Sequence, residues 1–118
     1  MAKILVVDNE PDTVDLIKSI LERYGFHVTT AYNGRQCLEK HKKGKHDLIL
    51  LDIMMPDMSG WEVYRKIRER DKETKIAFVS VIEVSPERKE SLKRNGISEY
   101  ITKPFTSEEL VQKVKAII

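Results

Sequence analysis

The stretch that decides the fold is Leu48-Ile49-Leu50-Leu51-Asp52, in which four consecutive aliphatic residues are followed directly by a carboxylate. A strand with no polar face is covered on both sides, and such strands belong to parallel sheets with helices on each face. In open α/β sheets the chemistry lies at the carboxyl ends of the strands. The sequence therefore predicts that Asp52 lies at the functional edge of such a sheet.

Other apolar runs of the chain end in the same way. Three of them finish in, or are followed by, a polar residue: Asp8, Ser80 and Lys103. Because parallel strands end at one edge of a sheet, four polar groups from four strands can converge on one small pocket.

Short apolar runs alternate with longer segments that carry apolar residues at helical spacing. We expect strands at residues 3–8, 26–30, 47–52, 75–81 and 100–102. We expect helices at about 11–24, 33–43, 61–71, 86–95 and 107–118. Five strand–helix units without repeats or a linker predict one doubly wound, three-layer α/β domain over residues 1–118.

Right-handed crossovers restrict the topology of such a domain. The flavodoxin-like strand order 2-1-3-4-5 would bring the first and third strands together, so that Asp8 and Asp52 become neighbours. The helix at 86–95 has only Leu92 as a clear aliphatic anchor and is expected to be the least firmly held. The last helix is expected to bury Leu110, Val111, Val114, Ile117 and Ile118, and the helix at 33–43 to turn Leu38 inward.

Composition limits the function classes. The chain has 118 residues, of which 41% are hydrophobic and 34% charged, which is typical of a globular domain with a real core. No apolar run approaches the roughly 20 residues that span a bilayer, so we expect no membrane partner, and no signal peptide is expected because residues 1–10 begin a strand at once. The single cysteine, Cys37, excludes an internal disulfide and predicts a reducing, cytoplasmic compartment.

The net charge of +2 does not favour nucleic-acid binding. The most basic run, residues 40–46, lacks interleaved aromatic residues, and we interpret it as a solvated helix end, where cations are favourable. Three histidines, His27, His41 and His46, do not have the spacing of metal ligands.

Clustered carboxylates repel one another unless a cation lies between them. Magnesium suits such a pocket, because it needs few protein oxygens and keeps several waters. Asp52 could then attack phosphorus and form an acyl phosphate, with Lys103 supplying positive charge and Ser80 a hydroxyl. Taken singly, Asp8 could be a helix N-cap, Ser80 a satisfied buried hydroxyl and Lys103 a surface lysine, but together they favour a site.

Four segments of the chain make a family resemblance specific. They are Val6-Val7-Asp8-Asn9-Glu10, the segment from Leu51 through Met55-Pro56 to Ser59-Gly60, Val79-Ser80, and Tyr100-Ile101-Thr102-Lys103-Pro104-Phe105. In this order, and over essentially the whole length, the chain resembles the receiver domain of two-component response regulators, of the chemotaxis-regulator type.

The resemblance implies that Asp52 is the phosphoacceptor, loaded from a phosphohistidine on a histidine kinase or a phosphotransfer protein. It implies a Mg²⁺ site formed by Asp8, Asn9, Asp52 and the backbone carbonyl of Met54. Ser80 and Lys103 would contact the phosphoryl group, and Tyr100 would be the aromatic switch that moves inward. The Lys103–Pro104 bond is expected to be cis.

The sequence departs from the family pattern around this pocket. Asn9 stands where a second acid is usual, which predicts weaker Mg²⁺ binding, partly compensated by Glu10. Val81 adds bulk beside the path to Asp52, which predicts slow phosphorylation by small donors. Met54 and Ile82 flank the phosphoryl position and offer a hydrolytic water no hydrogen bond, which predicts a long-lived phosphoaspartate.

The output surface implied by the resemblance is formed by the fourth helix, the fifth strand and the fifth helix. It would control a downstream protein that the sequence does not name, and a homodimer through the same surface is one form of that output. No DNA-binding module is visible, so we expect a stand-alone receiver or a piece of a longer protein.

Two other functions remain open at this point. A pseudo-receiver would act only as a protein-interaction module and never carry phosphate, and Asn9 and Val81 give this alternative some weight. A Mg²⁺-dependent phosphatase would need an aspartate two residues after the nucleophile, where the sequence has Met54. We therefore expect a signalling domain that catalyses only its own phosphorylation and dephosphorylation, and not an enzyme acting on other substrates.

Overall fold

The computed structural model describes residues 2–118 and contains a five-stranded parallel sheet with the order β2-β1-β3-β4-β5. The strands are β1 (Lys3–Val7), β2 (His27–Ala31), β3 (Leu48–Leu51), β4 (Lys75–Ser80) and β5 (Glu99–Thr102). The helices are α1 (Pro11–Arg23), α2 (Gly34–Lys40), α3 (Gly60–Arg70), α4 (Pro86–Arg94) and α5 (Ser107–Ile117). The predicted doubly wound, flavodoxin-like fold is confirmed.

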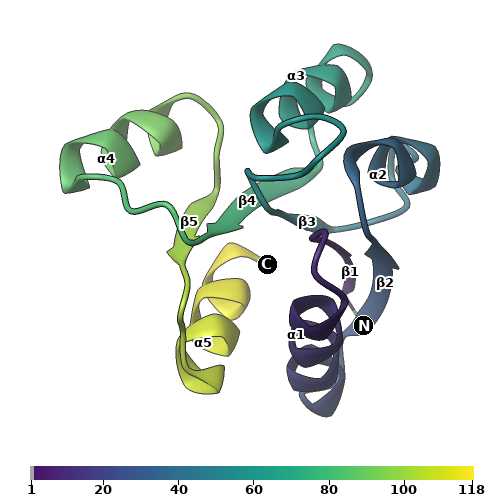
Figure 1. Cartoon of the computed structure of the whole chain (residues 1–118), viewed down its shortest axis with the longest axis vertical. Helices are drawn as coiled ribbons and strands as arrows, with labels where there is room; N and C mark the ends of the chain where they lie inside the picture. Colours follow the sequence, from purple (N-terminus) through teal and green to yellow (C-terminus); the bar gives the residue numbers. More distant parts are fainter. Residues whose placement is uncertain (1) are drawn as a thin grey trace.

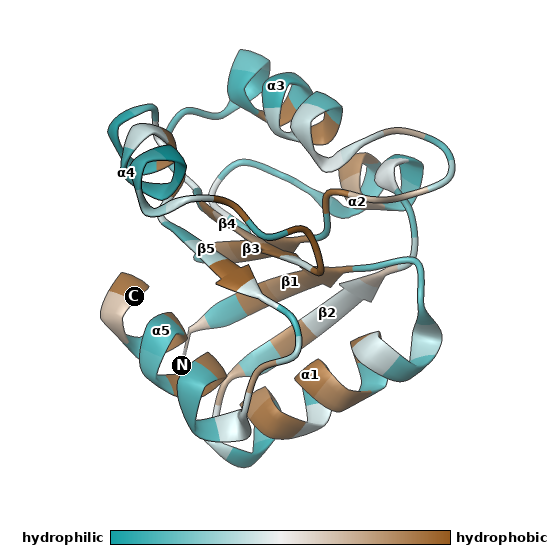
Figure 2. Ribbon diagram, turned by 60° about the vertical axis from the view of Figure 1, so that its left-hand side comes forward, coloured by the Kyte–Doolittle hydropathy of each residue, from teal (hydrophilic) through white to brown (hydrophobic). Residues whose placement is uncertain are grey.

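The sheet is the middle of three layers. Helices α1 and α5 cover one face, and α2, α3 and α4 cover the other (Figure 1). Two apolar clusters fill the spaces between the layers, and every residue of β3 is buried. In Figure 2 the central strands β1 and β3 are mainly hydrophobic, whereas β2 is paler and the helices alternate hydrophilic and hydrophobic segments. This arrangement agrees with the expectation that β3 is covered on both faces. Within residues 2–118, no helix is long and apolar enough to cross a membrane.

The start of α3 is fixed against the end of β3. The amide of Gly60 donates to the carbonyl of Ile53 at 2.8 Å, and Ser59 caps the helix by accepting from Glu62 N at 3.2 Å. A side chain at Gly60 would place its Cβ 2.4 Å from the carbonyl oxygen of Asp52. Glycine is therefore required for the helix to begin so close to the predicted site.

Several boundaries and side chains differ from the sequence-based expectations. Helix α2 ends at Lys40 instead of residue 43, because His41 has extended backbone (φ −71°, ψ 130°). The interpretation of residues 40–46 as a solvated helix end is wrong for His41 and His46, which are both buried. Ile118 does not belong to the buried face of α5, since it is 44% exposed and follows the last residue of the helix.

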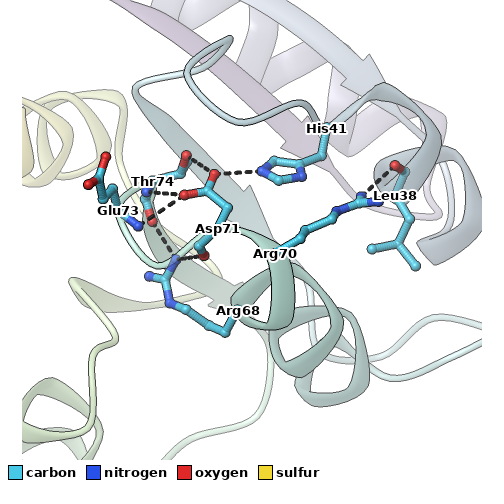
Figure 3. Close-up of polar contacts among 7 residues, drawn as sticks. All are labelled: Leu38, His41, Arg68, Arg70, Asp71, Glu73 and Thr74. Atoms are coloured by element: carbon cyan, nitrogen blue, oxygen red, sulfur yellow. Dashed lines mark hydrogen bonds and ion pairs between the residues drawn. The ribbon is translucent and has the colours of Figure 1, made fainter.

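The ring of His41 points toward the carboxylate of Asp71, with which it makes a polar contact (Figure 3). Its Nε2 lies 2.8 Å from Oδ2 of Asp71, the C-cap residue of α3, and both side chains are buried. Thr74 bonds the same carboxylate through its hydroxyl and its amide, and Glu73 N donates to it at 2.9 Å. This cluster joins the ends of α2 and α3 at the edge of the sheet opposite to Asp52.

Two further expectations concern the helices that flank this face. Helix α4 buries Leu92 alone, as predicted. In α2 the fully buried side chain is Cys37, whereas Leu38 is only partly buried. Burial raises the pKa of the Cys37 thiol to about 12, so this cysteine is a packed residue with almost no thiolate at neutral pH.

Candidate functional site

The carboxyl ends of β1 and β3 bring two aspartates side by side. Val7 pairs with Leu51, and the amide of Asp52 donates to the carbonyl of Val7 at 3.0 Å. The residues that follow the two strands, Asp8 and Asp52, are only 2% and 5% exposed. Two carboxylates are therefore held out of water at the switch point of the sheet, where ligands bind in this class of fold.

Lys103 reaches this pair from the end of β5. Its backbone is fixed by an amide hydrogen bond to the carbonyl of Ser80 at 2.8 Å. Its Nζ lies 2.6 Å from Oδ2 of Asp8 and 4.0 Å from Oδ2 of Asp52. The side chain is 12% exposed, so Lys103 is not an ordinary surface lysine. The following Lys103–Pro104 peptide bond is cis, as expected.

Asp8 is also not the N-cap of α1. The cap position is Glu10, which makes no side-chain cap hydrogen bond. Instead, Oδ1 of Asp8 accepts from the amide of Glu10 at 2.9 Å. One oxygen of Asp8 thus orders the loop after β1, and the other faces Lys103.

The surroundings of Asp52 disfavour the ionised form of its carboxyl group. Burial raises the pKa of its carboxyl above the ordinary value, and the nearby charge of Asp8 raises it further. Lys103 and the amides of Met54 and Ile53 act in the opposite direction, and Met54 N donates to Oδ1 at 3.3 Å. A cation placed between the two carboxylates would favour the ionised form.

Asp52 opens into a cavity of about 260 Å³. Its lining consists of Asn9, Glu10, Asp52, Met54, Val81 and Lys103. Asn9, Met54 and Val81 therefore line the same cavity as Asp52, and Val81 is 59% exposed. Ile82, which we expected to flank the phosphoryl position together with Met54, is not among the residues that line this cavity.

The donor set suits a small oxygen-seeking cation. Among residues 2–118, no three His, Cys, Asp or Glu side chains gather into a metal cluster. Magnesium does not need one, because two carboxylates with a carbonyl and several waters satisfy its coordination. Asp8 and Asp52 with the Met54 carbonyl and the amide oxygen of Asn9 could supply these ligands. The residues present therefore fit Mg²⁺.

Ser80 and Tyr100 lie behind the pocket. Ser80 is fully buried at the end of β4, and its hydroxyl oxygen accepts from the amide of Ile82 at 3.2 Å. The Tyr100 side chain is turned inward and donates its hydroxyl to the carbonyl of Ile82 at 2.5 Å. Both residues thus hold the loop after β4. The sequence did not reveal this role of the Ile82 backbone, because carbonyl contacts leave no residue-type signal.

Comparison with known proteins adds to this geometry. The family model described as "response regulator receiver domain" matches residues 4–115. The transcriptional regulatory protein ResD of Bacillus subtilis is 40% identical over 116 residues, which are 98% of this chain and 48% of that protein. TrcR of Mycobacterium tuberculosis is 35% identical over 98% of this chain and 45% of its own length. The chain spans about half the length of the curated relatives it matches.

Solved structures of response regulators have the same fold as this chain. The response regulator TrrA from Thermotoga maritima, in complex with Mg²⁺ and BeF, matches with a TM-score of 0.85 and 38% identity over the whole of both chains. The chemotaxis response regulator CheY4 of Vibrio cholerae matches with a TM-score of 0.89 and 33% identity, over 100% of this chain and 99% of that one.

Proposed function

The chain belongs to the response regulator receiver domain family, and on that premise we propose that Asp52 accepts a phosphoryl group from the phosphohistidine of a partner protein. The observation that carries this proposal is the pair of buried carboxylates, Asp8 and Asp52, that share the ammonium of Lys103 at the edge of the sheet. The partner would be a histidine kinase or a phosphotransfer protein, and the domain would work in a phosphorelay.

The transfer itself is a single displacement at phosphorus. A carboxylate oxygen of Asp52 attacks, and an O–P bond forms as the N–P bond of the donor breaks. The imidazole nitrogen of the donor leaves with the electron pair and then takes up a proton. The product is an acyl phosphate on Asp52, beside which the structure has a cavity of about 260 Å³.

Each neighbouring residue has a separate part in this proposal. Bound Mg²⁺, held by Asp8, Asn9, Asp52 and the Met54 carbonyl, would neutralise charge on the phosphoryl oxygens. Lys103 would pair with one of those oxygens and give up part of its contact with Asp8. The Ser80 oxygen accepts from Ile82 N, and its hydroxyl, which is also hydrogen-bonded to the Tyr100 side chain, would turn to donate to a further phosphoryl oxygen.

Tyr100 and Ser80 would couple phosphorylation of Asp52 to the outer surface of the domain. Both contact the backbone of Ile82, which lies in the loop between β4 and α4. A phosphoryl oxygen that draws Ser80 toward Asp52 would change the packing of the surface formed by α4, β5 and α5. A modest free-energy difference between two packings suffices to shift their populations. A downstream protein, or a second copy of the chain, would bind the selected packing.

The proposal also includes a long lifetime for the phosphoaspartate and a cytoplasmic location for the protein. Met54 offers no polar side chain at the cavity, which supports a slow loss of the phosphoryl group to water. A cytoplasmic location is supported by the lone buried thiol Cys37 and by the need for an intracellular kinase partner.

The alternative is a pseudo-receiver that binds partners without carrying phosphate, and the neutral Asn9 in the pocket supports it. Incubation with Mg²⁺ and acetyl phosphate, followed by intact-protein mass spectrometry, separates the two. We expect the wild type to gain one phosphoryl group and Asp52→Asn to gain none. A wild type that stays unmodified at saturating donor and Mg²⁺, with a kinase as second donor, would establish the pseudo-receiver.

A further inference from the structure

The loop between β3 and α3, residues 52–59, supplies the backbone carbonyl of Met54 to the proposed metal site. Its inner end is tied to the strand and to the start of α3. Met54 N bonds Oδ1 of Asp52, and Gly60 N bonds the carbonyl of Ile53. Beyond this tied end the loop is open to solvent, since Met54 is 56% exposed and Pro56 is also exposed. The position of the carbonyl therefore depends on what holds the outer end.

Asp57 holds that outer end against α2. Its Oδ1 accepts from the amide of Gly34 at 3.0 Å, and its Oδ2 accepts from the amide of Arg35 at 2.9 Å. Oδ1 also accepts from the amide of Met58 at 3.0 Å. Both carboxylate oxygens are thus used on a helix that lies 22 and 23 residues earlier in the chain.

Apolar packing closes the same junction. The Met58 side chain lies over Gly34 so tightly that a Cβ at Gly34 would be 2.3 Å from its Cγ. Met58 is partly buried against the core cluster on this face of the sheet. The loop is therefore seated on the first turn of α2 by a polar contact and an apolar contact next to each other.

We propose that Asp57 is a positioning residue for the metal site, an inference that rests on the proposed function. By fixing the outer end of the loop, Asp57 holds the Met54 carbonyl where Mg²⁺ can use it, so that binding does not have to order the loop first. Asp57 touches neither the metal nor the phosphoryl group in this account. Its effect should therefore appear in the affinity for Mg²⁺ and not in the rate at saturating Mg²⁺.

The test compares Asp57→Ala and Asp57→Asn with a matched control, Asp47→Ala. Asp47 is also an exposed carboxylate that accepts a distant backbone amide, Lys3 N at 2.7 Å, but it precedes β3 at the opposite edge of the sheet. Mg²⁺ affinity is measured by calorimetry, stability by thermal unfolding, and phosphorylation with acetyl phosphate over a range of Mg²⁺ concentrations.

We expect Asp57→Ala to raise the Kd for Mg²⁺ about fivefold. Asp57→Asn, which keeps one acceptor oxygen, should lie between Asp57→Ala and the wild type. Saturating Mg²⁺ should restore the phosphorylation rate of both variants to within about twofold of the wild type. Asp47→Ala should lose thermal stability but keep the wild-type Kd.

The outcomes separate this inference from the function on which it rests. If the wild type binds Mg²⁺ and takes up phosphate, but both Asp57 variants bind Mg²⁺ equally well, the positioning role is wrong and the proposed function stands. A rise in Kd for Asp47→Ala as large as that for Asp57→Ala also overturns it, because the effect would then be general destabilisation. A wild type that neither binds Mg²⁺ nor accepts phosphate overturns both. If Asp57→Ala does not fold, Asp57→Asn decides by the same comparison.

Discussion

The ammonium of Lys103 and the carboxylate of Asp8 form an ion pair at 2.6 Å, in which both side chains are largely withdrawn from solvent. The contact joins the loops after β5 and β1, 95 residues apart in the chain. It neutralises Asp8 when no divalent cation is near. A metal that enters the pocket would therefore compete with Lys103 for Asp8.

The first prediction concerns this competition. Lys103→Met removes the ammonium group that pairs with Asp8. We therefore expect the Kd for Mg²⁺ to fall about threefold to tenfold, which is a gain in binding free energy on the order of 1 kcal/mol. Phosphorylation should nevertheless slow by about tenfold or more, because no fixed cation meets the phosphoryl charge. Calorimetry and donor kinetics measure the two effects. Weaker Mg²⁺ binding in Lys103→Met would show that the ion pair does not compete with the metal.

Asn9 provides a second prediction. It lines the cavity beside Asp52 but brings no charge to it. Asn9→Asp should lower the Kd for Mg²⁺ about tenfold, because a hard divalent cation gains a charged ligand. Asp15→Asn, on the exposed side of α1, serves as a charge control. Equal affinities for the wild type and Asn9→Asp would defeat this explanation.

Val81 leads to a third prediction. Val81 lines the cavity and is more than half exposed. Val81→Ala removes bulk beside Asp52, and we expect acetyl phosphate to phosphorylate it about threefold faster or more at equal Mg²⁺. Ile82→Ala is the neighbouring control, since Ile82 lies outside the cavity lining. An unchanged rate for Val81→Ala would count against steric control of small donors.

The fourth prediction concerns Asp71, far from the pocket. Burial works to raise the pKa of Asp71, but hydrogen bonds from Thr74 and His41 outweigh it and hold the pKa below the ordinary value. Ionised Asp71 therefore contributes stability above about pH 4 that is lost as the pH falls through the lower folded-state pKa. Asp71→Asn should lower the free energy of unfolding by about 2–3 kcal/mol at pH 7.

Urea unfolding between pH 7 and pH 3 measures this dependence. The difference between the wild type and Asp71→Asn should narrow steadily below about pH 4. Glu69→Gln, an exposed carboxylate on α3, should show no comparable loss. A constant difference across the pH range would mean that ionisation of Asp71 contributes nothing.

The sequence predicted the sheet well for a physical reason. The central strands are buried on both faces, so they appear as unbroken apolar runs such as Leu48–Leu51. The sequence also predicted that Asp8, Asp52 and Lys103 lie close together, because the residues that follow parallel strands meet at one edge of the sheet. The predicted end of α2 was wrong, because contacts with distant residues, and not the local sequence, end this helix at Lys40.

The remaining features depend on contacts between distant residues. His41 and Asp71 are 30 residues apart, and a histidine in a basic run looks solvated until its partner is known. The carboxylate of Asp57 resembles an ordinary turn residue, because the amides it accepts from belong to a different helix. Ile82 does not line the cavity, and its backbone is held by Tyr100 and Ser80, two contacts that the residue types do not reveal.

The most direct test of the central claim locates the phosphoryl group on the chain. The protein is phosphorylated with Mg²⁺ and a phosphodonor, treated with borohydride to reduce an aspartyl phosphate to homoserine, and digested for peptide mass spectrometry. We predict homoserine at position 52 and at no other aspartate, and none in protein treated without donor. Reduction at a different aspartate, or a wild type that never yields homoserine with either acetyl phosphate or a kinase, would contradict the account.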